Sequence, residues 1–211
     1  MASETDICNI ALSHIRAGSI NSLDDNSLQS KQCKLMYPIL RDQMLTDNDW
    51  QFSAKRQPLV LLDKEVFGYS RVYKYPNDCL YINRILPQYL DVQTTAHGSR
   101  ADQSSIDKFQ VPYDVMNVDG VQVIVTNYED LRIDYRSKVT KTNLFNTQFF
   151  MTLSRLIASE VAIPLVGMEK GRALQQDNFQ LYEAYLRNAV EATTNQQYTP
   201  PAESEFVTAR L

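Results

Sequence analysis

The sequence predicts a mixed α+β fold, because apolar residues repeat at helical spacing near both ends of the chain and at strand spacing in its middle. Four helices are expected to pack as a four-helix bundle, with an antiparallel β domain inserted between the second helix and the third. We place the bundle in residues 1–49 and 142–193, the inserted β-rich domain in residues 50–141, and an extended C-terminal tail in residues 194–211.

The first predicted helix has a start signal and a stop signal. Ser3 can cap it, with Asp6 three residues later completing a capping box, and Gly18 can end it. The apolar residues that follow the start lie on one face of this helix: Ile7, Cys8, Ala11, Leu12 and Ile15.

Asn26, with Gln29 three residues later, marks the start of the second predicted helix, which continues to about Asp47. Pro38 lies inside it and is expected to bend or break it, because proline lacks a backbone N–H and clashes with the preceding turn. The apolar positions again repeat at helical spacing: Cys33, Met36, Tyr37, Leu40 and Met44.

The middle of the chain changes to short runs of β-forming residues. The predicted strands are residues 59–62, 69–75, 80–86, 121–126 and 131–135. Several of them alternate apolar and polar residues, which predicts sheets with one solvated face. Asp119 and Gly120 predict a hairpin turn before the strand at Val121, and the polar residues 93–110 predict a long exposed loop.

Helical spacing returns at residues 149–161, and Pro164 and Gly167 mark the end of that helix. The last helix, residues 169–193, would be about 40 Å long, which is longer than a small core requires. Near its end, the tail then contains large apolar residues that either order against a partner or belong to a frayed end. We take them as the candidate partner-binding residues: Phe206, Val207 and Leu211.

Composition narrows the class of protein. A formal net charge of -4 and a pI near 5.2 argue against a chain whose main task is to grip phosphates. Uninterrupted apolar runs are far shorter than the roughly 18 residues of a membrane helix, so no membrane association is predicted. The N-terminal residues lack a secretory signal, which predicts that the protein is made and kept in a reducing cytoplasm. Cys8, Cys33 and Cys79 are therefore expected to be buried free thiols, not a disulfide or a metal site.

No group of residues predicts catalysis, a cofactor or a metal site. His14 and His97 have no ligand-type residue at metal-site spacing, and His97 beside Ser99 has no third group to orient a base. Nucleotide-binding and zinc-protease motifs are absent from the sequence. The paired carboxylates stand at predicted turns, where Asp caps backbone amides: Asp24 and Asp25, Asp47 and Asp49, Glu129 and Asp130. We therefore expect a protein that is not an enzyme.

Tyrosines and basic residues are interleaved in the predicted β region: Tyr69, Arg71, Tyr73, Lys74, Tyr75, Tyr81 and Arg84. Such a pattern could stack bases on a sheet, as proteins that bind single strands do. Alternating tyrosines are also typical of strand packing and of protein interfaces, and the acidic net charge favours this second interpretation.

Several short segments have a familiar order and spacing: Asp49-Trp50-Gln51-Phe52-Ser53-Ala54-Lys55-Arg56, Gly68-Tyr69, Tyr75-Pro76-Asn77-Asp78-Cys79-Leu80, Leu131-Arg132-Ile133-Asp134-Tyr135-Arg136, Phe145, Phe149 and Glu160-Val161-Ala162-Ile163-Pro164-Leu165. Together they resemble the tail tubular protein A family, the head-to-tail adaptors of short-tailed bacteriophages. Physical reasons also support structural roles in the fold for some of these residues. Trp50 and Phe52 are expected to seal the join between bundle and sheet, while Pro76 and Asp78 fix a turn before a strand.

The resemblance implies a structural role in the virion. It implies a ring of twelve copies between the portal protein and the tail nozzle protein, in the portal-proximal tail, assembled in the host cytoplasm. Double-stranded DNA would pass through the lumen during ejection without specific binding, which an acidic wall would favour. The tail residues Phe206, Val207 and Leu211 would dock on a neighbouring subunit or on the portal.

Two other classes remain open on the sequence. A nucleic-acid-binding virion protein would use Arg71, Lys74 and Arg84 to contact phosphates. A virion-associated hydrolase would need a working carboxylate, for which Asp24, Asp47 and Glu129 are the candidates.

Overall fold

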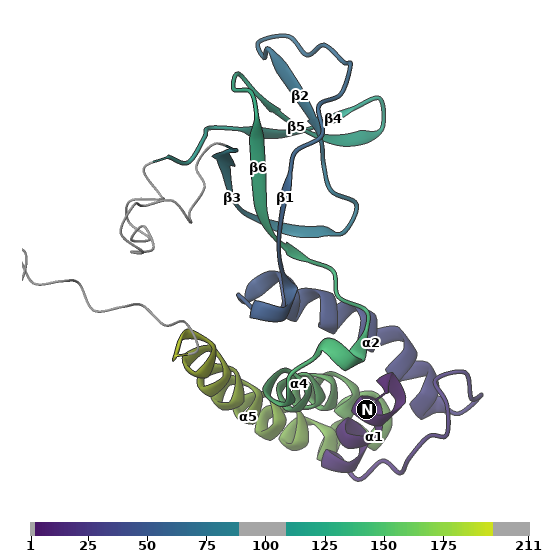
Figure 1. Ribbon diagram of the computed structural model, residues 1–211. Coiled ribbons are helices and arrows are strands. Elements are labelled where there is room, and N and C mark those ends of the chain that lie inside the picture. Colours follow the sequence, from purple (N-terminus) through teal and green to yellow (C-terminus); the bar gives the residue numbers. More distant parts are fainter. Residues whose placement is uncertain (1–2, 89–108, 196–211) are drawn as a thin grey trace, which may run out of the picture. The chain divides into compact units, whose positions relative to one another are not determined.

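The structure, a computed structural model, describes residues 3–88 and 109–195 (Figure 1). This part of the chain contains four α-helices and two small antiparallel sheets, which confirms a mixed α+β class. The chain divides into two compact units. The helical unit comprises Met1–Lys55, Pro76–Asn83 and Tyr135–Thr193, and the strand unit comprises the described residues of Arg56–Tyr75 and Arg84–Asp134.

Helix α1, Glu4–His14, begins with the predicted capping box. Asp6 N donates to Ser3 Oγ over 3.1 Å, and Ser3 N donates to Asp6 Oδ2 over 2.7 Å. Its predicted end at Gly18 is wrong. The helix ends at His14 because Arg16 adopts a left-handed conformation, with φ of 57°, and the N–H of Ala17 turns back to the Leu12 carbonyl over 3.0 Å.

Helix α2, Leu28–Asp47, begins slightly later than predicted and ends where predicted. The N-cap is Ser27, whose hydroxyl accepts from Ser30 N over 3.1 Å, so the predicted start at Asn26 is wrong by about one residue. The helix continues through Pro38 without a break.

Helices α4, Thr147–Val166, and α5, Met168–Asn195, lie close to their predicted bounds. Asn146 caps α4 by accepting from Phe149 N over 2.7 Å, and Gly167, with φ of 88°, ends it as predicted. By length and composition alone, α4 could cross a bilayer. More than half of that apolar window is buried inside the chain, so packing already accounts for its hydrophobicity. A search for uninterrupted apolar runs misses this helix, because Arg155 and Glu160 interrupt its apolar sequence.

The core of the helical unit forms where α4 packs against α1 and α2. Cys8 and Cys33 are buried free thiols, as predicted, whereas Cys79 is only partly buried. A hydrogen bond to the Cys33 thiol and burial raise the pKa of Cys8, which keeps this thiol protonated. The largest buried side chains of this core include Ile7, Leu12, Tyr37, Met44, Leu45, Trp50 and Phe149.

In the residues that the structure describes, six strands form two sheets, with orders β1-β6-β3 and β2-β5-β4. Their bounds are β1 Ala54–Pro58, β2 Arg71–Lys74, β3 Cys79–Pro87, β4 Asp114–Val118, β5 Val121–Thr126 and β6 Leu131–Ser137. Four predicted strands are confirmed. The predicted strand at 59–62 is wrong, because β1 precedes it and Leu61 makes only an isolated bridge with Tyr73. Strand β4 was not predicted.

The predicted hairpin turn at Asp119 and Gly120 is confirmed. Both residues have positive φ, 54° and 78°, and they connect β4 to β5 where Val118 pairs with Val121. Most of the predicted loop at 93–110, with His97, lies outside the described residues, as do Phe206, Val207 and Leu211.

Candidate functional site

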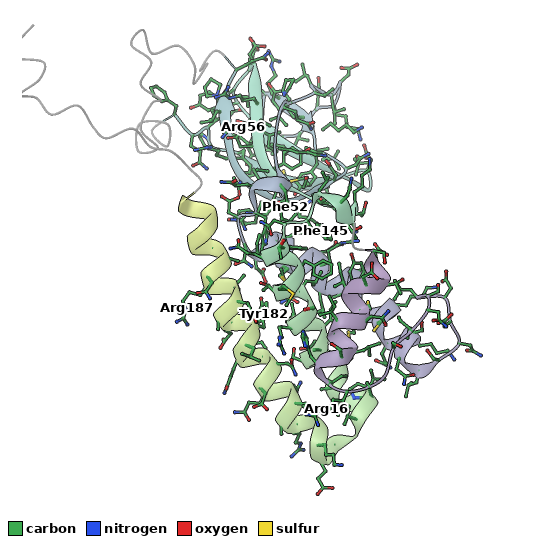
Figure 2. All side chains as sticks on the ribbon, turned by 60° about the horizontal axis from the view of Figure 1, so that its bottom comes forward. Arg16, Phe52, Arg56, Phe145, Tyr182 and Arg187 are labelled. Atoms are coloured by element: carbon green, nitrogen blue, oxygen red, sulfur yellow. The ribbon has the colours of Figure 1, made fainter. Side chains whose placement is uncertain are left out.

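Four aromatic rings from separate segments meet inside the helical unit. Trp50 follows α2, Phe52 lies in the 3-10 turn Gln51–Ser53, and Phe145 and Phe149 lie just before and within α4. The Phe145 and Phe149 centroids are 4.6 Å apart, and those of Phe52 and Phe145, which Figure 2 shows next to each other, are 5.6 Å apart. The Trp50 indole N–H donates to the Met44 carbonyl over 2.9 Å. This aromatic cluster ties the end of α2 to the start of α4.

Asp78 is the centre of a second cluster in the same unit. Its carboxylate accepts hydrogen bonds from Lys55 Nζ and, over 2.9 Å, from the Tyr135 hydroxyl. Its backbone carbonyl accepts from Lys138 N over 2.7 Å. Burial alone would raise the pKa of Asp78, but the hydrogen bonds from Lys55 and Tyr135 outweigh it and lower that pKa. Burial, together with this carboxylate, raises the pKa of the Tyr135 hydroxyl. Asp78 therefore connects β1, β3 and β6 within the helical unit.

Arg136 extends this network to the end of α2. Its guanidinium donates to the Thr46 carbonyl and lies 3.9 Å from Asp49. The same guanidinium lies 4.8 Å from the centre of the Tyr81 ring, within the range of a cation–π interaction. These contacts engage the Arg136 side chain within the helical unit, so Arg136 acts here as a structural residue.

No protein family model matches the chain, and the search of curated proteins found no significant match.

His14 packs beside α4. Its Nε2 lies 3.5 Å from the Ser154 hydroxyl, which is fully buried and donates to the Met151 carbonyl over 2.8 Å. Burial, and then the charge of Arg155, lower the pKa of His14, so the neutral imidazole is favoured. A serine hydroxyl bonded to its own helix within a core is not placed to attack a substrate. His14 is a packing residue in this structure.

Two of the three candidate hydrolase carboxylates form separate ion pairs. Asp24 pairs with Lys34 over 2.7 Å, and Glu129 of the strand unit forms an ion pair with Arg71. Asp47 ends α2, thirteen residues after Lys34, which is about 20 Å along a helix. Two carboxylates that hydrolyse a glycosidic bond stand roughly 5–9.5 Å apart. Asp24 and Asp47 therefore do not form such a pair.

Several of the interleaved tyrosines and cations make contacts within the strand unit. Tyr73 is buried and donates to the Tyr128 carbonyl over 3.0 Å. Arg84 pairs with Asp134 over 2.9 Å, and Arg56 lies 3.2 Å from the same carboxylate. Tyr73 and Arg84, like Arg71, are thus already engaged within the strand unit.

Within residues 3–88 and 109–195, no three His, Cys, Asp or Glu residues come close enough to hold a metal ion. The structure instead shows an apolar surface that we did not predict. Leu28, Leu35 and Ile39 of α2 are each more than half exposed, and we call them the α2 stripe. Helical spacing could have revealed it, since these residues point away from the predicted core positions of the same helix.

A hollow of about 530 Å³ lies between α4 and α5. It opens beside a close crossing of the two helices, where a Cβ on Gly171 would lie 2.8 Å from Ile163 Cα. The residues that line the hollow are Ser159, Glu160, Ile163, Arg172, Gln175, Gln176 and Phe179. We call it the α4–α5 hollow.

Proposed function

We propose that this chain is a structural head-to-tail adaptor of a short-tailed bacteriophage. In this proposal twelve copies form a ring between the portal protein and the tail nozzle protein, and the ring lines the channel through which DNA leaves the head. The four helices would form a bundle, and residues 50–141 would be a β domain inserted into it. The protein would act mechanically and without a cofactor.

One observation carries the proposal. The residues that resemble the adaptor family come from separate segments of the sequence, and many of them meet within the helical unit. Trp50, Phe52, Phe145 and Phe149 form one aromatic cluster, and Asp78 accepts hydrogen bonds from two others, Lys55 and Tyr135. A resemblance that arose by chance gives no reason for such convergence, whereas residues inherited as a fold framework would be expected to meet.

The charges of the strand unit fit a wall that DNA passes without being held. Arg71 pairs with Glu129 and Arg84 pairs with Asp134, so these guanidinium groups are neutralised locally. A protein that grips phosphates keeps such groups available for them. This observation favours the adaptor over a nucleic-acid-binding virion protein.

The test is electron microscopy of the purified chain mixed with the portal ring of its own phage. An added rotationally symmetric layer on one portal face, with a countable number of copies, is expected. Circular dichroism of the same sample establishes that the chain is folded. Bare portals at concentrations well above micromolar, with a folded chain, would contradict the proposal.

A shortened chain tests the proposed role of the tail. Removal of residues 196–211 deletes Phe206, Val207 and Leu211 and leaves the described helices complete. The shortened chain is expected to attach to the portal more weakly than the full chain. Unchanged attachment would remove these three residues from the proposal while leaving the adaptor role intact.

A further inference from the structure

Strand β4 forms one edge of the sheet with the order β2-β5-β4. In the part of the chain that the structure describes, β4 pairs only with β5. Its first four residues are exposed, and among them Val115 is 41% and Met116 is 40% exposed. A free edge with apolar side chains is a place where a further strand can add, and proteins usually cover or charge such an edge. Strand β4 has one charged residue, Asp114, and no proline that would prevent such pairing.

The tight turn between Val118 and Val121 determines which backbone groups of β4 face this edge. Beside a two-residue turn, the flanking residues exchange both backbone hydrogen bonds, and such pairs alternate along the hairpin. Met116 therefore bonds to β5, whereas the N–H and C=O groups of Val115 and Asn117 point away from it. Among residues 3–88 and 109–195, no other backbone group bonds to them.

The opposite side of the sheet follows the same alternation. Continued across β5, it requires the backbone groups of Val72 and Lys74 in β2 to point away from β5. They do: Leu62 N donates to the Val72 carbonyl over 2.8 Å, and Lys74 N donates to the Val60 carbonyl over 2.8 Å. The outward direction of the two β4 residues thus follows from a ladder that is regular across the sheet.

The C-terminal residues 206–210 have the properties of a strand that fits this edge. Phe206, Val207 and Thr208 are β-forming residues, and the segment contains no proline or glycine. Backbone hydrogen bonds to an exposed sheet edge are a common way to bind an extended segment. We propose that in the free chain residues 206–210 add to the β4 edge of the same chain as an antiparallel strand.

Charge complementarity selects the register. Asp114, at the start of β4, forms no ion pair with another described residue. Arg210 is the one basic residue in the sequence 196–211. With Arg210 opposite Asp114 in an antiparallel pair, Phe206 lies opposite Val118. Val118 is partly buried against an apolar cluster of the strand unit, so Phe206 extends that cluster.

The same register supplies the missing backbone partners. Ala209 lies opposite Val115, and Val207 lies opposite Asn117, both as hydrogen-bonded pairs. The outward N–H and C=O groups of β4 are then all bonded to backbone. A shift of one residue would turn the side chains of the added strand to the other face, so this register makes a specific prediction.

The length of the connection favours the same chain over a second copy. Ten residues, 196–205, link the end of α5 to Phe206, and they span at most about 36 Å when fully extended. A segment on such a tether has an effective concentration in the millimolar range, which exceeds a micromolar concentration of other copies. The inference does not depend on the adaptor role. It goes beyond that role by giving the tail a place in the free chain, from which it would be released when it docks on a partner.

The first test measures amide hydrogen exchange in the free full chain and in a chain without residues 196–211. The N–H groups of Val115 and Asn117 are expected to exchange at least tenfold more slowly in the full chain. Those of Met116 and Val118 bond to β5 and should exchange equally in both chains, which makes them the internal control. Equal exchange at Val115 and Asn117 in the two folded chains would overturn the inference.

The second test places two cysteines in one chain. Met116→Cys and Thr208→Cys would form a non-hydrogen-bonded pair, in which side chains lie closest. The background is Cys79→Ser, because the other two cysteines are fully buried. Oxidised glutathione at micromolar protein is expected to give at least tenfold more intramolecular disulfide than in the control, Met116→Cys with Val207→Cys, whose side chain would lie on the opposite face. Disulfides found only between copies would overturn the inference.

A proline substitution distinguishes strand addition from a contact made by side chains alone. Val115→Pro removes the outward N–H and leaves the bonds between β4 and β5 in place, and edge strands accept proline at such positions. It should lower the yield of the disulfide between positions 116 and 208 at least tenfold, whereas Val115→Thr should leave the yield unchanged. An unchanged yield in a Val115→Pro chain that circular dichroism shows to be folded would overturn the inference. Hydrogen exchange on the unaltered strand is the independent result if this variant misfolds.

The outcomes separate this inference from the proposed function, because every measurement uses the free chain without portal rings. A portal layer in electron microscopy, without protection of Val115 and Asn117 in the free chain, would overturn the inference and leave the adaptor role standing. Protection and the intramolecular disulfide, without a portal layer, would support the inference and count against the adaptor role.

Discussion

The indole ring of Trp50 packs edge-on against the ring of Phe149, with centroids 4.9 Å apart and planes at 89°. This arrangement places the positive edge of one aromatic system against the negative face of the other. Trp50 is 1% exposed and Phe149 is fully buried. One residue follows α2 and the other lies in the first turn of α4, so the contact fixes two helices that are about a hundred residues apart in the sequence.

Trp50→Ala should therefore destabilise the helical unit by about 3–5 kcal/mol, because it removes a large buried ring and leaves a cavity. Urea unfolding followed by circular dichroism measures the loss, since Trp50 is the chain's one tryptophan and its fluorescence disappears with it. Phe67→Ala is the control, because Phe67 is fully exposed and its loss should change stability by less than about 0.5 kcal/mol. Equal effects of the two substitutions would contradict this account.

Gly171 sets how closely α5 approaches α4. A methyl group at this position would lie 2.8 Å from Ile163 Cα and 3.1 Å from the Ala162 carbonyl oxygen, and a backbone cannot yield as a flexible side chain can. Gly171→Ala should cost about 1–3 kcal/mol by overpacking, although alanine favours helices by about 1 kcal/mol. Ala173→Gly, at an exposed position of the same helix, should cost about 1 kcal/mol from propensity alone. A more stable Gly171→Ala variant would show that the two helices can separate at little cost.

Arg16 holds a left-handed conformation that glycine adopts more readily. It closes α1 with φ of 57°, and its own N–H bonds to the Ser13 carbonyl over 3.2 Å. The left-handed region costs a side-chain-bearing residue about 1–2 kcal/mol, which exceeds the extra entropy that glycine loses on folding. Arg16→Gly should therefore raise the free energy of unfolding by about 0.5–1 kcal/mol. Arg16→Ala keeps the strain and should be close to neutral, so equal thermal midpoints for both variants would argue against the cap.

The helical starts and stops show which parts of the fold are local enough to read from the sequence. Ser3 and Asp6 form their capping box within four residues, and Asp119 and Gly120 form their turn within two, so no tertiary contact is needed to specify either. The predicted end of α1 was wrong because glycine adopts the left-handed conformation more readily than arginine, which favoured Gly18 over Arg16 as the residue that ends the helix. Packing of Ile15 and Ile20 into the core requires the chain to turn earlier than Gly18.

The strands that the sequence missed are those without an apolar pattern. All five residues of β1 are exposed, and four of five in β4 are exposed, so neither strand alternates in hydrophobicity. Backbone pairing with a neighbouring strand specifies them instead: β1 lies beside β6, and β4 pairs with β5 from Asp114↔Val125 to Val118↔Val121. The α4–α5 hollow was likewise hidden, because it depends on how closely Gly171 lets two helices cross. Of these features that we did not predict, only the α2 stripe could have been found from the sequence, because positions 28, 35 and 39 fall on one face of a helix.

His14 should make stability depend on pH. Burial lowers its pKa in the folded chain, so as pH falls below about 6.5 the unfolded state takes up a proton before the folded state does. The free energy of unfolding should then decrease as pH falls from about 7 to about 5. His14→Gln should flatten this dependence, and His97→Gln serves as the control at the chain's other histidine. If the pH dependence of the free energy of unfolding persists in His14→Gln but is lost in His97→Gln, it arises from His97 and not from His14.

Asp78 should act in the same sense as His14, but at lower pH. Its folded pKa is lowered by the hydrogen bonds from Lys55 and Tyr135, so its stabilisation is complete above the unfolded pKa of about 3.9 and is lost as pH falls through the folded pKa. Because the side chain is 37% exposed, Asp78→Asn should cost only about 1 kcal/mol near neutral pH. Urea unfolding from pH 7 to about 3 should show this difference shrinking. Asp24→Asn removes an exposed ion pair to Lys34 and should change little at any pH, so a similar loss in both variants would mean that Asp78 is only another surface charge.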